Sequence, residues 1–168
     1  MQRRFFTAAL PVALIVAGAT FATAAEMAKD KMTSHGESRA YLHGYNLPST
    51  GIALEGYCPV AYIEANKAIK GSPEFPSTYN GVTYYFVSSD AKRLFDSNPE
   101  KYLPAYGGWC ATGILHGKNF PVDPTSFKVV NGRTLLFLKN KGVDAKRLWD
   151  QGNERQQIAK ADANWEKH

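Results

Sequence analysis

Two Asn-Gly pairs constrain the fold of this 168-residue chain more than any other feature of its sequence. Each pair stands between two short runs that are rich in β-branched and aromatic residues: 77–79 and 82–87 around Asn80-Gly81, and 127–130 and 134–138 around Asn131-Gly132. Asn-Gly in this setting is the strongest short-range signal for a β-hairpin, because both residues can adopt a positive φ. The sequence therefore predicts two antiparallel hairpins.

Short helices are predicted after each hairpin. Ser88 or Ser89 is placed to cap a helix whose buried face we expect to consist of Ala91, Leu94 and Phe95. A proline opens a further short turn at residue 99. Residues 142–149 and 155–165 are predicted as two more helices, and the second has its apolar residues on one face at Ile158, Ala161 and Trp165.

Two segments ahead of the first hairpin are predicted to be strand and loop. Residues 60–63 combine β-branched and aromatic side chains, which favours a strand. Residues 72–76 contain two prolines, which favours a loop. We see no internal repeat of the solenoid type. The fold class is therefore predicted as α+β, with small antiparallel hairpins packed against short helices in one domain.

The first 24 residues have the pattern of a cleaved signal peptide. Arg3 and Arg4 precede an apolar run over residues 8–22, which ends in an Ala-x-Ala cleavage pattern. The run is short and interrupted by Pro11, so a stable membrane span is not expected after cleavage. We predict a periplasmic or secreted protein that uses the general secretory route, although the arginine pair also fits the twin-arginine route.

The rest of the chain divides into a polar, flexible segment at residues 25–50 and a globular domain at residues 51–168. The first of these contains two Met and two His, which we interpret as a solvated linker rather than a copper site. The formal net charge is +5, but acidic and basic residues alternate, and no basic block is interleaved with aromatic residues. Nucleic acid is therefore excluded as a predicted partner.

Cys58 and Cys110 are the residues best suited to chemistry, and three interpretations of them stay open. In an exported protein, a lone pair of cysteines is most simply a structural disulfide. Two thiolates with His116 could instead hold a soft metal ion, copper before zinc. The pair could also cycle between dithiol and disulfide, although no Cys-x-x-Cys motif is present.

No catalytic constellation is recognisable in the sequence. Nucleotide-binding loops, Gly-x-Ser-x-Gly and His-Glu-x-x-His are all missing, so we expect a protein that is not an enzyme. Four aromatic residues are candidates to line a pocket, against the plainer interpretation that they fill a core: Tyr57, Tyr62, Tyr85 and Trp109.

Several motifs, taken in order, resemble the YHS domain family, and in particular its exported bacterial branch. These are Gly-Tyr-Cys-Pro-Val-Ala-Tyr at 56–62, Tyr-Asn-Gly-Val-Thr-Tyr-Tyr-Phe-Val-Ser at 79–88, Pro-Glu-Lys-Tyr at 99–102, Tyr-Gly-Gly-Trp-Cys-Ala at 106–111 and Ala-Lys-Ala-Asp-Ala-Asn-Trp at 159–165. The resemblance covers residues 51–165, which is nearly all of the expected mature chain.

The resemblance implies a core related to the treble clef, but without its metal site. Shorter family members look like treble-clef metal binders, and the places of their cysteines are taken here by Ala61, Val87 and Ala91, which cannot ligate a metal. Members of the exported branch usually have Asp where this chain has Cys58, whereas Cys110 is a usual feature of the branch. Some relatives are labelled as selenoproteins, which adds weight to a reactive sulfur here.

The predicted function is that of an exported metal-binding module, with copper favoured, in which Cys58, Cys110 and His116 are the ligands and a metal-handling protein is the partner. Two alternatives are a thiol–disulfide redox protein that uses the same two cysteines, and a disulfide-stapled structural or interaction domain. The sequence does not indicate whether Cys58 and Cys110 lie close together in space.

Overall fold

The computed structural model describes residues 44–48 and 50–168. The predicted signal peptide and residues 25–43 of the predicted flexible segment lie outside the described residues, so the predictions made for them stay predictions.

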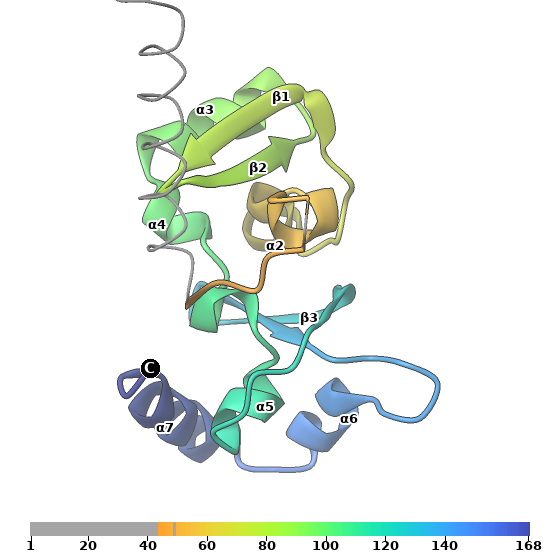
Figure 1. The fold of residues 1–168 in the computed structure, drawn as a ribbon, viewed down its shortest axis with the longest axis vertical. Helices are drawn as coiled ribbons and strands as arrows, with labels where there is room; N and C mark the ends of the chain where they lie inside the picture. Colours follow the sequence, from red (N-terminus) through yellow and green to blue (C-terminus); the bar gives the residue numbers. More distant parts are fainter. Residues whose placement is uncertain (1–43, 49) are drawn as a thin grey trace, which may run out of the picture. The chain divides into compact units, whose positions relative to one another are not determined.

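Helices and two hairpins alternate along the described chain. In order these are η2 (Ala53–Gly56), α2 (Pro59–Ala65), β1 (Ser72–Tyr79), β2 (Val82–Phe86), α3 (Ser89–Ser97), α4 (Pro99–Tyr102), η3 (Ala105–Gly108), α5 (Ala111–Leu115), β3 (Asp123–Val130), β4 (Arg133–Phe137), α6 (Ala145–Asp150) and α7 (Glu154–Trp165). β1 pairs with β2 and β3 with β4, each as a separate antiparallel two-stranded sheet (Figure 1). The fold class is α+β, as predicted.

Both hairpins form where the Asn-Gly pairs predict them. Asn80 and Gly81 have φ values of 50° and 76°, and Asn131 and Gly132 have values of 51° and 74°. Two consecutive positive φ values are what the tight hairpin turn requires, because they match its twist to that of the flanking strands.

The same order of elements occurs twice. We call residues 53–97 the first repeat and residues 105–150 the second repeat. Each contains a short η turn, a helix, an Asn-Gly hairpin and a capped helix. α4 connects the two repeats and α7 follows the second. No solenoid-type repeat is predicted from the sequence. The structure contains a different kind of repeat, a unit of about one hairpin and two helices that occurs twice.

The two hairpins agree in detail. In the first, Ser72 pairs with Phe86 and Pro76 with Tyr85, with a register shift between them. In the second, Asp123 pairs with Phe137 and Phe127 with Leu136, again with a register shift between them. The helices that follow share the sequence Asp-Ala-Lys-Arg-Leu, at residues 90–94 and 144–148. Residues of the two repeats can therefore be matched one to one.

Residues 60–63 are helical, so the strand predicted there is wrong. They belong to α2, which has Pro59 at its first position and ends at Asn66 in the left-handed region. Proline fixes a φ suitable for the first helical turn and has no N–H that the turn would need to satisfy. The helix buries Val60 and Tyr62, so tertiary packing outweighs the strand preference of these residues.

Residues 72–76 are the first half of β1, so the loop predicted there is wrong as well. Pro73 and Pro76 lie within this strand, at the place where its register shifts. Among the described strands, β1 is hydrogen-bonded only to β2, and an edge strand with an irregularity tolerates proline because some of its N–H groups have no partner strand.

The helices after the hairpins are capped as their sequences predict. The Ser88 hydroxyl accepts a hydrogen bond from the backbone N of Ala91 at 3.2 Å, and the Asp144 carboxylate accepts one from the backbone N of Arg147 at 3.0 Å. Ala91 and Phe95 are buried in α3, but Leu94 is 46% exposed, which contradicts its predicted place on the buried face.

Two apolar clusters form the core, one for each repeat. Tyr84, Phe86 and Phe95 are central to the first cluster. Their matched residues in the second repeat, Leu135, Phe137 and Trp149, belong to the second cluster. Each hairpin thus buries one face against the helices of its own repeat, as Figure 1 shows for β1 and β2 beside α3.

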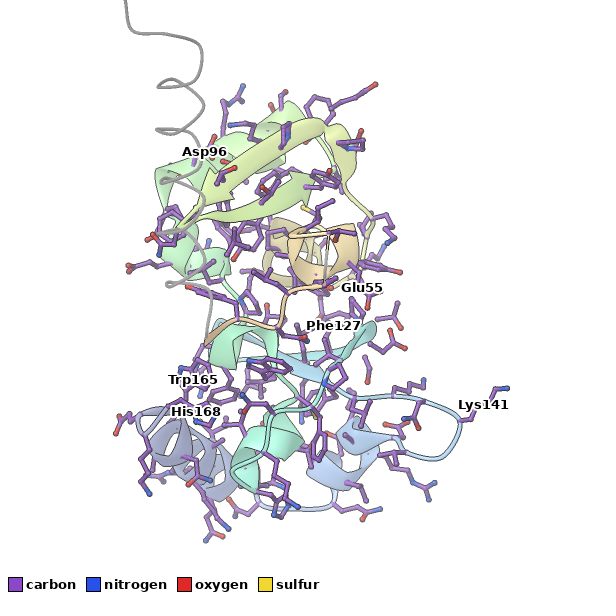
Figure 2. All side chains as sticks on the ribbon, viewed as in Figure 1. Glu55, Asp96, Phe127, Lys141, Trp165 and His168 are labelled. Atoms are coloured by element: carbon purple, nitrogen blue, oxygen red, sulfur yellow. The ribbon has the colours of Figure 1, made fainter. Side chains whose placement is uncertain are left out.

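The second hairpin also buries its other face, and it does so against the first repeat. Leu136 is 0% exposed and belongs to the first cluster. The Tyr62 ring of α2 lies edge-on to Phe127, with ring centroids 4.8 Å apart, and its hydroxyl donates to the carbonyl of Pro124 at 2.9 Å. Figure 2 shows Phe127 on the side of the second hairpin that faces the first repeat.

Among the described helices, none has the length and apolar character that crossing a membrane would require.

Candidate functional site

Each repeat opens with a turn of three consecutive residues in the left-handed region. The turns consist of residues 54–56 and 106–108, and their φ values lie between 50° and 83°. Three of the six residues are not glycine. A non-glycine residue in this region costs about 1 kcal/mol or more, so the fold must support each turn through its surroundings. An aromatic residue and then a cysteine follow each turn.

Cys58 and Cys110 occupy matched positions in the two repeats. Each is the N-cap of the following helix, α2 or α5, and neither side chain caps it. The backbone N of Cys58 donates to Ile69 O at 2.9 Å, and that of Cys110 donates to Phe120 O at 3.1 Å. Both thiols are free, 0% and 1% exposed, and lie in different apolar clusters. The chain therefore has two cysteines at these positions because the structural unit that contains one of them occurs twice.

His116 lies at the C-terminal end of α5 and is exposed, whereas Cys110 at the start of the same helix is buried. Within residues 44–48 and 50–168, no three or more His, Cys, Asp and Glu side chains gather in a way that could hold a metal ion. The structure does not bring the predicted copper ligands Cys58, Cys110 and His116 together as such a group.

The four predicted pocket aromatics occupy different places. Tyr62 is buried at the contact between the repeats, where burial raises its hydroxyl pKa. Tyr57 lies beneath the Lys70 ammonium, 4.6 Å from its ring centroid. Its match in the second repeat is Trp109, which packs against the second cluster. Only Tyr85 of the four lines a cavity described below.

A cavity of about 390 Å³ lies on the first repeat, and we call it the first-repeat cavity. Its walls combine the left-handed turn, the start of β1, the second strand and the chain that leads into η2: Pro48, Thr50, Ile52, Glu55, Gly56, Lys70, Gly71, Pro73 and Tyr85. Most of these side chains are apolar, and the two charged ones have opposite signs. Such a surface suits an apolar ligand that carries a few polar groups.

A second cavity, of about 200 Å³, contains the matched wall in the second repeat. The residues Gly108, Pro121, Val122 and Pro124 correspond to Gly56, Lys70, Gly71 and Pro73. Here the wall is covered by residues 46–48 and by Leu54 and Glu55 of the first repeat. The first-repeat cavity thus exposes a wall whose match in the second repeat has Asn46 and Leu47 lying against it, while Pro48 lines both cavities.

The covering segment is held by hydrogen bonds to the second left-handed turn. Asn46 donates from its backbone N to Gly107 O at 2.8 Å and from its side-chain amide to Gly108 O at 3.1 Å. A Cβ on Gly107 would lie 2.1 Å from the carbonyl oxygen of Gly44, so the segment requires glycine at this position. The first repeat has Glu55 at the matched position, and its side chain is exposed.

Lys70 is the cation of the first-repeat cavity. Its ammonium donates to the backbone carbonyl of Glu55 at 2.6 Å and lies over the Tyr57 ring. The matched carbonyl in the second repeat is that of Gly107, which accepts from Asn46. The Lys70 ammonium therefore takes the place that a peptide N–H takes in the second repeat.

A polar cluster secures α7 against the second repeat. Arg133 donates two hydrogen bonds to the Asp162 carboxylate, at 3.0 and 2.9 Å, and the Tyr106 hydroxyl donates a third at 2.9 Å. These contacts, that of Arg133 foremost, lower the pKa of Asp162. Burial, followed by the contact with Asp162, raises the pKa of Tyr106. Trp165 of the same helix packs on Tyr106, and Figure 2 shows Trp165 near His168, whose ring stacks on it. The cluster is structural.

Comparison of the chain with protein-family models, with curated proteins and with solved structures gave no match.

Sequence reasoning missed the first-repeat cavity because it missed the repeat. Two signals could have revealed it: Gly-Tyr-Cys at 56–58 against Gly-Trp-Cys at 108–110, and Asp-Ala-Lys-Arg-Leu at 90–94 against 144–148. Aligning the two Asn-Gly pairs between these motifs, at an offset of 51 residues, matches Tyr85 with Leu136 and Lys70 with Pro121. The first repeat has Lys70 and Tyr85 where the second repeat has the apolar residues Pro121 and Leu136. This difference would have indicated the open surface.

Proposed function

We propose that this chain is a binding module and not an enzyme, and that the first-repeat cavity is its binding site. One observation carries this proposal: a wall that occurs in both repeats is covered by the chain itself in the second and open in the first. A surface able to hold one segment of chain has the shape and apolar character to hold another ligand.

The chemistry of the cavity favours an apolar ligand with limited charge. Ile52, Pro48 and Pro73 supply aliphatic surface, and Tyr85 supplies a half-buried ring. Lys70 and Glu55 balance one another in charge, so neither a strongly anionic nor a strongly cationic ligand is favoured over a neutral one.

Binding of the fluorescent dye anilinonaphthalene sulfonate tests this proposal, because the dye combines an apolar ring system with a single charge. We expect the folded chain to bind the dye, and Tyr85→Ala or Thr50→Trp to reduce the bound fraction severalfold. Leu148→Ala, at an exposed leucine outside the cavity, is the matched control. Equal binding by all four proteins would contradict the proposal, provided that their near-ultraviolet circular dichroism is unchanged.

Copper binding through Cys58, Cys110 and His116 is a second candidate. The observation that favours it is that both thiols are free, since a soft metal needs unbridged sulfur. The double variant Cys58→Ser/Cys110→Ser should then bind Cu(I) far more weakly than the parent. Unchanged Cu(I) affinity would end this candidate. A redox role or a structural disulfide would instead appear as oxidation to a Cys58–Cys110 bond in the exported protein.

We also propose that the protein is exported and that it belongs to the YHS family, on the strength of the residue motifs alone. The intact mass of the protein, expressed with its own N-terminus, tests export: cleavage after Ala24 supports it, and an uncleaved chain in the cytoplasm contradicts it.

A further inference from the structure

We infer that the first-repeat cavity binds a short peptide segment of Asn-Leu-Pro type, presented by a partner polypeptide. This inference rests on the proposed function and specifies the ligand. It draws on the segment that the chain places against the matched wall of the second repeat, where residues 46–48 have the sequence Asn-Leu-Pro.

The contacts in the second repeat show what such a peptide gains. Asn46 satisfies two carbonyl groups of the left-handed turn, those of Gly107 and Gly108. Leu47 packs against the first cluster, which belongs to the first repeat, and both Leu47 and Pro48 line the second cavity. The backbone N of Leu47 donates to Tyr45 O at 3.0 Å within the segment, which leaves the backbone N and the side chain of Asn46 to pair with the turn.

The first repeat offers a match for one of these two carbonyls, because the carbonyl of Gly56, the match of Gly108, already accepts from the backbone N of Gly71 at 2.8 Å. Its turn presents the carbonyl of Glu55 at the position of the Gly107 carbonyl, and the apolar wall continues through Pro73 and Tyr85. The carbonyl is accessible to a donor from outside the turn, because the Lys70 ammonium already reaches it at 2.6 Å. A bound peptide N–H would replace this ammonium, which would then return to water.

Glu55 limits the peptide on its N-terminal side. In the second repeat the chain crosses Gly107 so closely that a Cβ there would lie 2.1 Å from the Gly44 carbonyl oxygen. Glu55 has a Cβ at the matched position and a similar left-handed φ of 50°. A peptide in the same arrangement can therefore begin at the residue matched to Asn46, but it cannot extend two residues further toward its N-terminus.

The test is a titration of the full chain, followed by NMR of its backbone amides, with two synthetic probes. The short probe is acetyl-Asn-Leu-Pro-amide, and the long probe is acetyl-Gly-Tyr-Asn-Leu-Pro-amide. We expect the short probe to shift the amides of Ile52, Gly56 and Gly71, with a dissociation constant on the order of 1 mM, as befits so small a ligand. Thr50→Trp, which places an indole at the exposed rim of the cavity, should abolish these shifts.

Two further variants test the arrangement of the peptide. Lys70→Gln removes the competing ammonium, so we expect affinity for the short probe to rise roughly threefold, whereas Lys67→Gln, the matched control in the same loop, leaves it unchanged. Glu55→Gly should admit the long probe, which the parent binds at least roughly tenfold more weakly than the short one. Equal binding of both probes by the parent would overturn the assigned arrangement.

The failures of this inference and of the proposed function can be told apart. If the dye binds in the cavity but the short probe shifts no amide there, the peptide ligand is wrong and the binding module stands. If neither binds, both are wrong. Shifts confined to residues outside the cavity would also overturn the peptide site.

Discussion

The two repeats are built alike and differ in what covers them. Both contain a left-handed turn, a buried cysteine, an Asn-Gly hairpin and a capped helix. The second hairpin is buried on both faces, against its own helices and against the first repeat. The first hairpin is buried on one face, and the other borders a cavity. The difference indicates that features shared by the repeats support the fold, whereas features found in one repeat alone deserve a functional explanation.

This comparison also bears on the cysteines. The repeat of the fold places one buried, free cysteine in each repeat, and the two belong to different apolar clusters. This arrangement does not require a bond between the two sulfurs. Both thiols are also buried, so a reactant cannot reach either sulfur in the folded chain. The site residues specific to the first repeat, such as Lys70 and Tyr85, therefore carry more functional weight in our account.

The largest expected effect is a difference in the free energy of unfolding between alanine variants of the matched residues Leu136 and Tyr85. Leu136→Ala removes a fully buried side chain at the contact between the repeats and should lower the free energy of unfolding by about 2–5 kcal/mol. Tyr85→Ala affects a half-buried ring at an open cavity, so about 1 kcal/mol or less is expected. Urea denaturation of both variants measures the difference. Similar losses for the two would show that the faces are not distinct.

The next effect concerns the matched turn residues Gly107 and Glu55. Gly107→Ala should destabilise the protein by about 1–3 kcal/mol, because its methyl group collides with the Gly44 carbonyl. Glu55→Gly should stabilise it by about 1 kcal/mol, since glycine adopts the left-handed conformation without strain. Thermal unfolding of both variants tests this, and a loss of stability on Glu55→Gly would refute the claim that the left-handed conformation of Glu55 is strained.

A smaller, pH-dependent effect is expected at the polar cluster of Arg133, Tyr106 and Asp162, which joins α7 to the second repeat. The contact with Arg133 lowers the pKa of Asp162 in the folded state. The ionised carboxylate therefore stabilises the fold at pH values above its unfolded pKa of about 4, and this contribution disappears as the pH falls through the folded pKa.

Arg133→Met should remove this stabilisation, which is under about 1 kcal/mol because both side chains are more than one-third exposed. Measured from pH 6 down to pH 2, the free energy of unfolding of the variant should fall less than that of the parent. Lys160→Met, at an exposed lysine of α7, serves as the control. An unchanged pH dependence for Arg133→Met would rule out the role given to Asp162.

The smallest effect is expected at the matched leucines Leu94 and Leu148. They are 46% and 53% exposed, so Leu94→Ser and Leu148→Ser should each change stability by less than about 0.5 kcal/mol. A larger loss at either position would reveal a contact that this account omits.

Local sequence signals predicted the fold correctly where neighbouring residues determine the backbone conformation. The Asn-Gly turns and the Ser88 cap depend on residues within three or four positions, and both were predicted from the sequence. The conformations of residues 60–63 and 72–76 were not predicted correctly. α2 is helical because Pro59 starts it and because its apolar side chains are buried. β1 accommodates its prolines because its pairing with β2 shifts register there. Those outcomes depend on partners that are distant in the sequence.

The candidate site was harder to predict than the fold. The sequence singled out Cys58, Cys110 and His116 by residue type, but residue type does not reveal that the thiols lie in separate clusters and the imidazole in solvent. Tyr85 was named as a pocket aromatic and does line a cavity. Lys70 and Glu55 have no distinguishing pattern of their own, and their role appears only when each is compared with its match in the second repeat.

The most direct test of the account compares matched amides of the two repeats in a single NMR titration of the full chain with anilinonaphthalene sulfonate. We expect shifts at Gly56 and Gly71 in the first repeat, and none of comparable size at their matches Gly108 and Val122, which residues 46–48 cover. Equal shifts in both repeats, or shifts in the second alone, would contradict the claim that the first repeat holds the open binding surface.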